Sequence, residues 1–347
     1  MRLCRDVYSS MSDGVGIVRP GGLECLEESN SVLWGVNWDD FMNQYLSLAA
    51  LLRRHEDDGL PPPLGVPVSY RNRSLRIGIA STCDYKEGSV LHGIDRISLE
   101  NRQAYSALHG YHVEFRTDNH IPSRHPVWSA VSLPLEMLDS GKFDWVLSMD
   151  CDCLFINMTV TLEHMLYRQG GLAGPQGPQL DPNAHFLISE DGRGLAGGSW
   201  MIRNSDWSRS FLRSVLGPLD EVHTYDRHDL KDQFALLWHL LVLFSRAPRH
   251  MVIKPFDRPE PARAEFSDVG VAGWPELQYI PEVRLIPQRL INAYPWALCR
   301  PSHHCFQDDE DFIVSFITLS SQSREMAFAM LNKFRAQAMS NYELSAH

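Results

Sequence analysis

The sequence predicts an α/β domain of the Rossmann-like type, with a mixed, mostly parallel central sheet. Strand and helix patterns alternate from residue 75 onward, which is typical of βαβ units. The segment at 143–149, FDWVLSM, is a short apolar run bounded by acidic residues, as in a strand at the centre of a parallel sheet. The chain has 347 residues, of which 44% are hydrophobic and only 22% charged, enough to bury a sizeable core.

The first half of the domain alternates strictly between strands and helices. Its first strand has the β-branched, turn-bounded character of a buried strand. The first helical pattern ends at Gly110, a residue type that favours helix ends, and Pro134 is expected to kink or delay the second helix. The predicted elements are a strand at 75–82, a helix at 94–109, a strand at 111–117, a helix at 127–138 and a strand at 143–149.

The second half is less regular, and a proline-rich stretch at 254–281 is expected to wrap the surface. The predicted elements are strands at 185–189 and 197–203, helices at 205–217 and 229–244, strands at 282–287 and 311–317, and a closing helix at 324–339. We expect an N-terminal arm or linker at 1–73, one domain at 74–340 and a tail at 341–347.

Composition and charge exclude several classes of function. Thirty-two basic and 43 acidic residues give a net charge of −11, which repels nucleic-acid phosphates and anionic lipids, so no nucleic-acid partner is predicted. No apolar run reaches the roughly 20 residues that span a bilayer, and the N-terminus lacks a secretory signal pattern. Seven cysteines are too sparse for a disulfide scaffold, and we expect Cys151 and Cys153 to be free thiols that point into the core.

Two acidic residues follow the predicted central strand directly. Asp150 and Asp152 alternate along the chain, so both carboxylates can face the same way. Ligands of open α/β sheets bind at the carboxyl ends of strands, and paired carboxylates suit a hard divalent cation that also contacts substrate phosphates. Two interpretations stay open here: a metal site, or two solvated acids that cap the following helix.

A glycine-rich segment and the start of a later helix offer further polar groups. Glycines in the first segment allow close approach of a ligand, and its two acids can accept hydrogen bonds from sugar hydroxyls. An acid and an amide at the helix start can orient a substrate. A plain hairpin turn and a plain helix cap are the alternatives. The residues are Glu190, Asp191, Gly198, Asp232 and Gln233.

Seven segments resemble the glycosyltransferase family of fungal galactomannan α-galactosyltransferases, Golgi α-mannosyltransferase subunits and plant xyloglucan α-xylosyltransferases. They occur in the family's order and cover about residues 75–335. The segments are NRQAYSALHGY (101–111), the tryptophan segment at Trp128, FDWVLSMDCDCLFINM (143–158), SEDGRGLAGGSWMIRNSDWSRSFL (189–212), DQFAL (232–236), IPQRLINAYP (286–295) and EDFIVSF (310–316).

The resemblance implies a GT-A fold and a retaining α-transfer of a hexose or pentose from a nucleotide-diphosphate sugar to a glycan hydroxyl. It assigns Asp150 and Asp152 to Mn²⁺, or alternatively Mg²⁺, because a cation there neutralises the charge of the departing nucleotide. It also implies a Golgi lumenal, membrane-associated enzyme and hetero-oligomers with related glycosyltransferases. The remaining site residues are the catalytic Asp191, Asp232 and Gln233, and the substrate-binding Glu190, Gly198, Trp128, Asn292 and Tyr294.

Three positions depart from the family pattern. Where relatives carry a histidine that completes the metal site, this chain has Ser315, a poor metal ligand. Ala130 replaces the lysine expected after Trp128, and Ala196 replaces the asparagine of the glycine-rich motif. Three hypotheses follow: an active transferase, a homologue that binds or forms complexes without turnover, and a metal-independent transferase. Two carboxylates, diphosphate oxygens and water still suffice to hold a cation.

Overall fold

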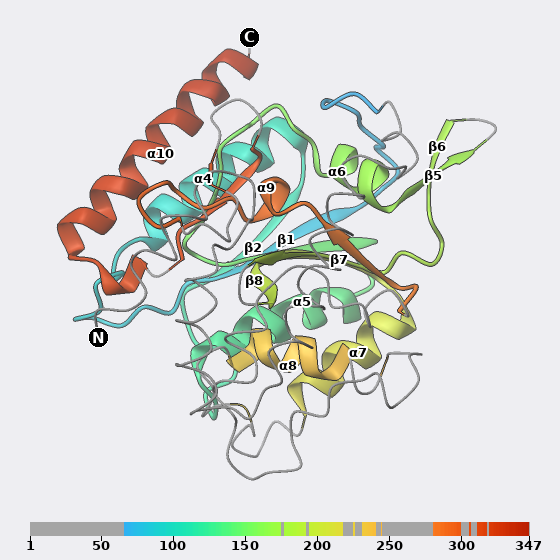
Figure 1. The fold of residues 1–347 in the computed structure, drawn as a ribbon, viewed down its shortest axis with the longest axis horizontal. Helices are drawn as coiled ribbons and strands as arrows, with labels where there is room; N and C mark the ends of the chain where they lie inside the picture. The colour runs from blue at the N-terminus through green and yellow to red at the C-terminus, as the bar shows by residue number, and fades with distance from the viewer. Residues whose placement is uncertain are drawn as a thin grey trace, which may run out of the picture.

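A six-stranded mixed sheet lies at the centre of the structure, between two layers of helices (Figure 1). This computed structural model describes residues 66–174, 177–191, 194–217, 225, 231–240, 244, 280–299, 305–306, 311–317 and 319–346. The strand order is β2-β1-β3-β8-β7-β9. These strands are β1 (Ile77–Thr82), β2 (His112–Arg116), β3 (Trp145–Met149), β7 (Phe186–Asp191), β8 (Gly194–Arg203) and β9 (Val283–Ile286).

The strand directions confirm the predicted α/β class and the mixed, mostly parallel sheet. β1 pairs in parallel with β2 and β3, and β9 pairs in parallel with β7. β8 is antiparallel to both of its neighbours, β3 and β7, because β7 and β8 follow each other closely in the chain and pair as a hairpin. β3 is therefore central, as predicted, but only one of its two neighbours runs parallel to it.

Two helical layers cover the sheet. Pro134 lies inside α5, which begins only after a short 3-10 turn, and α4 ends as predicted at Gly110, whose φ of 72° is left-handed. α5, α7 and α8 cover one face, and α4, α6, α9 and α10 lie on the other side (Figure 1). The helices are α4 (Asp95–His109), η1 (Pro126–Trp128), α5 (Ser129–Asp139), α6 (Leu162–Gly170), α7 (Asp206–Leu216), α8 (Lys231–His239), α9 (Gln288–Ile291) and α10 (Arg324–Ala346).

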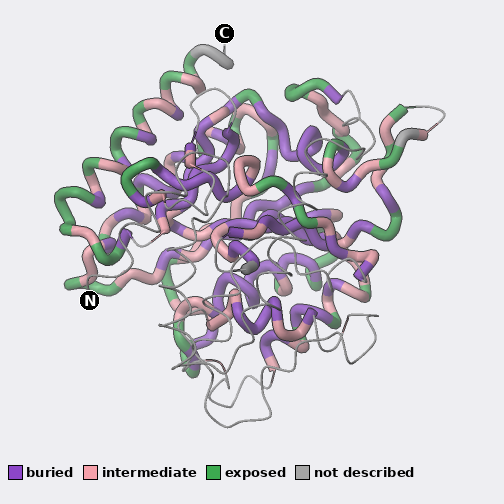
Figure 2. Tube along the Cα trace, in the orientation of Figure 1, coloured by how far each residue is buried: buried purple, intermediate pink, exposed green. Residues whose placement is uncertain are grey.

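Buried residues form one core on each side of the sheet, and Figure 2 shows that the sheet and the inner helix faces are largely buried. Four small features of the fold were not predicted from sequence: β4 (Cys153–Phe155), the hairpin of β5 (Gly171–Gly174) and β6 (Gly177–Leu180), α6 and α9. β4 pairs with β10 (Ile313–Ser315), which lies within the strand predicted at 311–317. β4 is directly relevant to function, because it begins one residue after Asp152.

Two features of the structure lie across the predicted domain limits at residues 73 and 340. Residues 66–73, in the expected arm, contact α6: the Thr161 hydroxyl donates to the Tyr70 carbonyl at 2.6 Å. α10 is continuous to Ala346, past the predicted limit at 340. Residues 1–65 and 254–279 lie outside the described residues. None of the helices in the described part is both long and apolar enough to cross a membrane.

The described residues contain two disulfides, and one of them shows that the prediction of a free Cys151 thiol was wrong. Cys83 is bonded to Cys151, so Cys151 is not the free thiol expected from its place between two acids. The reason is tertiary: Cys83 follows β1, and β1 lies beside β3, which leads to Cys151. Cys299 is bonded to Cys305, whereas Cys153 is free and buried, as predicted.

Candidate active site

Asp150, Cys151 and Asp152 form a turn, the DCD turn, between the carboxyl end of β3 and the start of β4. Its main chain is tied to two other strands. The Asp150 N–H donates to the Gly198 carbonyl of β8 at 2.8 Å, and the Phe316 N–H donates to the Asp152 carbonyl at 2.9 Å. The turn therefore lies at the sheet edge where open α/β folds bind ligands.

Helix α4 holds the DCD turn from a second side. The fully buried Arg102 guanidinium donates to the carbonyls of Asp150, at 2.6 Å, and Cys153, at 3.2 Å. The Ser98 hydroxyl donates to the Cys151 carbonyl. Because these contacts use only main-chain oxygens of the turn, they leave the side chains of Asp150 and Asp152 available. Within the described residues, neither carboxylate accepts a hydrogen bond from another residue.

The acids of the site perturb one another. Burial, then the nearby Asp152 and Asp232, raise the pKa of Asp150 well above its ordinary value. Burial raises the pKa of Asp152 to about 6 and that of Asp232 to about 7. Carboxylates held together with little water favour either a proton or a cation. The Arg102 guanidinium counteracts only part of this effect.

This donor set fits a hard cation that keeps other ligands. No group of three or more His, Cys, Asp or Glu is arranged as a metal site among the described residues. Two carboxylates nevertheless match Mn²⁺ or Mg²⁺, since these ions commonly complete their coordination with water and substrate phosphate oxygens. The site is therefore suited to a cation that arrives together with an anionic substrate.

Gly198 is the point at which the predicted segments meet. A Cβ atom on Gly198 would lie 2.7 Å from Ser315 Oγ, 2.8 Å from Asn292 Oδ1 and 3.4 Å from Cys153 Sγ. The Gly198 carbonyl also accepts from the Asp150 N–H. Strands β3, β4, β8 and β10 can approach this closely only because residue 198 has no side chain.

Asp232 and Gln233 lie in the first turn of α8, and Gln233 faces residues 195–197 of β8. The Gln233 side-chain amide donates to the Leu195 carbonyl. A Cβ on Gly197 would lie 3.3 Å from Gln233 Cβ and 3.5 Å from Gln233 Oε1. Since the amide nitrogen is bonded, the carbonyl oxygen is the end of the Gln233 amide that remains for a ligand. The structure thus brings both Gln233 and the DCD turn against residues 195–198 of β8.

The other predicted residues have mainly buried partners. The Tyr294 hydroxyl donates to the Asp191 carboxylate at 2.6 Å, and both residues are buried. The Asn292 amide donates to Ser189 Oγ at 2.8 Å and to the Ser199 carbonyl at 2.9 Å, so it joins β7 to β8. Their roles toward a substrate stay predictions.

The two remaining predicted residues are Trp128 and Glu190, and Glu190 pairs with Leu195 of β8, whose carbonyl accepts from Gln233. Trp128 is completely buried in the core between the sheet and α5, α7 and α8. Glu190 precedes Asp191 on β7 and is only partly buried. Any contact of Trp128 or Glu190 with a sugar stays a prediction.

One of the positions that depart from the family pattern, Ser315, lies beside the DCD turn. Ser315 ends β10, where it pairs with Cys153 of β4, one residue from Asp152. It is buried, and its hydroxyl hydrogen bonds to Cys153. Ala196 lies on β8 opposite Ser189, and the carbonyl of Ala130 accepts from Ser148 of β3 at 3.0 Å.

Sequence reasoning missed the residues that support the turn. Arg102, with Ser98 and Asn101, was detectable: the three occupy one helix face at i, i+3 and i+4. Tyr85, after β1, was not detectable, because only the fold brings it close to the acids. Burial and the charges of Asp152 and Asp150 raise the pKa of Tyr85.

The sequence is similar to a known family and to several of its members. The model of the galactosyl transferase GMA12/MNN10 family matches residues 76–173 and 179–324. The chain is 26% identical over 182 residues to an alpha-1,2-galactosyltransferase of Schizosaccharomyces pombe, covering 44% of this chain and 48% of that protein. It is 24% identical over 199 residues to the probable alpha-1,6-mannosyltransferase MNN10 of Saccharomyces cerevisiae, covering 49% and 50%.

The chain spans about half the length of the curated relatives it matches. Among solved structures, it is similar to a glycosyltransferase involved in the glycosylation of the major capsid of PBCV-1. That match has 12% identity and a TM-score of 0.42, and it covers 74% of this chain and 99% of the other.

Proposed function

Because the chain belongs to the galactosyl transferase GMA12/MNN10 family, we propose that it is a retaining α-glycosyltransferase. It transfers a hexose or a pentose from a nucleotide-diphosphate sugar to a glycan hydroxyl. The observation that carries this proposal is the DCD turn: two available carboxylates at the end of the central strand, coupled electrostatically to Asp232 at the start of α8. The galactosyl- and mannosyltransferase names of its relatives support hexose donors in particular.

Asp150 and Asp152 would hold Mn²⁺ or Mg²⁺ against the donor diphosphate. A bound cation supplies positive charge beside the leaving nucleotide, whose negative charge grows as the glycosidic bond breaks. The protein's own contribution is to keep both carboxylates in place, through Arg102, Gly198 and the Cys83–Cys151 disulfide. Rigid positioning of this kind lowers the reorganisation needed in the transition state.

Gln233, Asp232 and Asp191 would act on the sugar side of the reaction. The anomeric carbon becomes positively charged in the transition state, and oxygen acceptors stabilise that charge. Gln233 is suited to this, because its bond to the Leu195 carbonyl leaves Oε1 as its available acceptor. Asp191 is held by Tyr294, so we assign Tyr294 to positioning and Glu190, Gly198, Trp128 and Asn292 to the substrate pocket and its walls.

A second candidate is a homologue that binds its ligands or forms complexes with related glycosyltransferases but has weak or no turnover. Ser315 favours it, since this hydroxyl occupies the position from which relatives are expected to add a histidine ligand. The same substitution leaves room for a third outcome, transfer without a metal. The metal-dependent transferase, the binding homologue and the metal-independent transferase differ in whether nucleotide is released and whether EDTA stops its release.

We further propose that the protein works in the Golgi lumen. Two disulfides support this location, because disulfides persist in oxidising compartments and are rare in reducing ones. The resemblance to Golgi enzymes is the second support. Association with a membrane or with other glycosyltransferases belongs to the same proposal.

Nucleotide release tests the proposal directly. Purified protein with Mn²⁺ would be incubated in turn with UDP-galactose, UDP-glucose, UDP-xylose and GDP-mannose. We expect release from at least one donor, abolished by EDTA, and a fall in kcat/KM of at least about 100-fold for Asp150→Asn or Asp152→Asn. Asp206→Asn is the matched control: its carboxylate is 99% exposed, and it follows the end of β8, which lies beside the amino end of β3 and so at the opposite edge of the sheet.

Each hypothesis has its own outcome. Silence with all four donors rejects the transferase, and donor binding by calorimetry without release then supports the binding homologue. Release that survives EDTA and both substitutions supports metal-independent transfer instead.

A further inference from the structure

A cavity of about 730 Å³ lies at the edge of the sheet opposite the DCD turn. Residues at the starts of β1 and β2 and just before β3 line it, so it is at the amino ends of three parallel strands. The DCD turn follows the carboxyl end of β3. The volume is within the range of small-molecule sites, and the cavity is separate from the candidate active site.

Permanent positive charges line this cavity, and none of its lining residues is acidic. Two histidines, His109 and His112, also contribute to the lining. This is unexpected in a chain whose net charge is −11. The four cationic residues are Arg71, Arg73, Arg76 and Lys142.

Neighbouring acids neutralise only two of the four cations. Arg76 forms an ion pair with Asp144 at 2.7 Å, and Arg71 Nε lies 3.1 Å from a carboxylate oxygen of the buried Glu163. The other two cations form no ion pair within the described residues. The carboxyl end of α4, at the cavity wall, adds about half a negative charge. A surplus of more than one positive charge remains, which favours a multiply charged anion.

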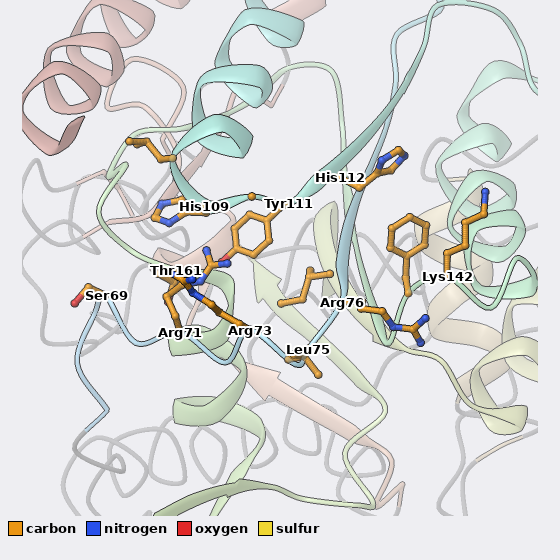
Figure 3. A pocket seen from close by; sticks show the side chains of 14 residues that line it. Ser69, Arg71, Arg73, Leu75, Arg76, His109, Tyr111, His112, Lys142 and Thr161 are labelled. Atoms are coloured by element: carbon orange, nitrogen blue, oxygen red, sulfur yellow. The ribbon is translucent and has the colours of Figure 1, made fainter. Parts of the chain in front are cut away.

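Arg71 has one donor without a hydrogen-bond partner among the described residues. Its Nη1 is buried and has no hydrogen-bond partner in the described part of the chain, and its guanidinium carbon lies 4.7 Å from the centre of the Tyr111 ring. A buried donor without a partner is costly, and it leaves the charge of Arg71 only partly satisfied at the wall of the cavity. Figure 3 shows the cations on two sides of the cavity: Arg71 and Arg73 on one, and Arg76 and Lys142 on the other.

We propose that this cavity binds a phosphorylated small molecule or headgroup that carries at least two negative charges. Guanidinium groups match the oxygens of phosphate through paired N–H donors, and a lysine adds a compact charge. The two cations without ion pairs, Arg73 and Lys142, balance a dianion, whereas a single carboxylate would leave one of them uncompensated. The cavity volume leaves room for the organic part of such a ligand.

Calorimetry with pyrophosphate tests this proposal. The full chain would be titrated at low ionic strength in the presence of EDTA, so that no metal recruits the anion to the DCD turn. We expect about one site per chain, and at least about tenfold weaker binding for Arg73→Gln/Lys142→Gln. Arg96→Gln/Lys333→Gln, which removes two exposed cations elsewhere, should bind as wild type does. Asp150→Asn/Asp152→Asn should also leave the affinity unchanged.

Vesicles distinguish a soluble ligand from a lipid headgroup. Co-sedimentation with vesicles that contain phosphatidylinositol 4-phosphate, but not with phosphatidylcholine alone, would be compared between wild type and Arg73→Gln/Lys142→Gln. Vesicle binding that needs Arg73 and Lys142, without pyrophosphate binding, assigns the anion to a headgroup. Failure of both probes to bind, or equal losses in the Arg96→Gln/Lys333→Gln control, would overturn the proposal. Circular dichroism and thermal unfolding confirm that the exposed substitutions leave the fold intact.

Discussion

Replacing Cys83 and Cys151 together by alanine is predicted to lower the free energy of unfolding by about 4 kcal/mol. The disulfide between them joins the end of β1 to the DCD turn and closes a loop with a sequence separation of 68. The loss comes mainly from the unfolded chain, which gains conformational freedom when the loop is opened.

The second disulfide provides an internal comparison. Cys299 and Cys305 are separated by only 6 positions in the sequence. The same loop-entropy relation gives about 2 kcal/mol for Cys299→Ala/Cys305→Ala. The two double variants remove the same kind of bond, and the relation attributes most of the difference between them to loop length.

Urea unfolding followed by tryptophan fluorescence measures both losses. The slope of the free energy against urea concentration should be compared as well, since opening the larger loop expands the unfolded state and changes this slope more. Hydrogen exchange at the Asp150 N–H, which is bonded to the Gly198 carbonyl at 2.8 Å, reports whether the turn itself loosens. Equal losses for the two double variants, or a larger loss for the 299/305 pair, would refute the loop-entropy reasoning.

Two further predictions concern the packing and the acids of the site. Gly198→Ala should cost about 1–3 kcal/mol. Its Cβ would lie 2.7 Å from Ser315 Oγ and 2.8 Å from Asn292 Oδ1. Gly170→Ala, whose Cβ would meet its nearest atoms at 3.6 Å, is the control, and equal urea midpoints for the two variants would contradict the steric argument. Burial raises the pKa of Asp232 to about 7, so its stabilising protonation is present in acid and is lost as the pH rises through about 7. Without metal, Asp232→Asn should therefore show a smaller fall in unfolding free energy from about pH 4 to about pH 8 than wild type, and identical falls would disprove the role of burial.

Local sequence patterns determined the order of most strands and helices and the position of the DCD turn. β1, α4 and β3 follow from apolar periodicity, and the end of α4 follows from Gly110, because helix and strand formation depend on neighbours within a few residues. The place of Asp150 and Asp152 after β3 followed from the same patterns. Their prediction as site residues drew also on the family resemblance.

Tertiary structure alone decided which distant residues complete the site. Gly198 lies 48 positions after Asp150, and Ser315 lies farther still, yet both contact the turn or the residue that follows it. The antiparallel direction of β8 and the Cys83–Cys151 bond were likewise absent from any local pattern. Pairings of this kind depend on which faces of the chain pack together, and that is settled by burial and packing over the whole domain rather than by the residues next to each one.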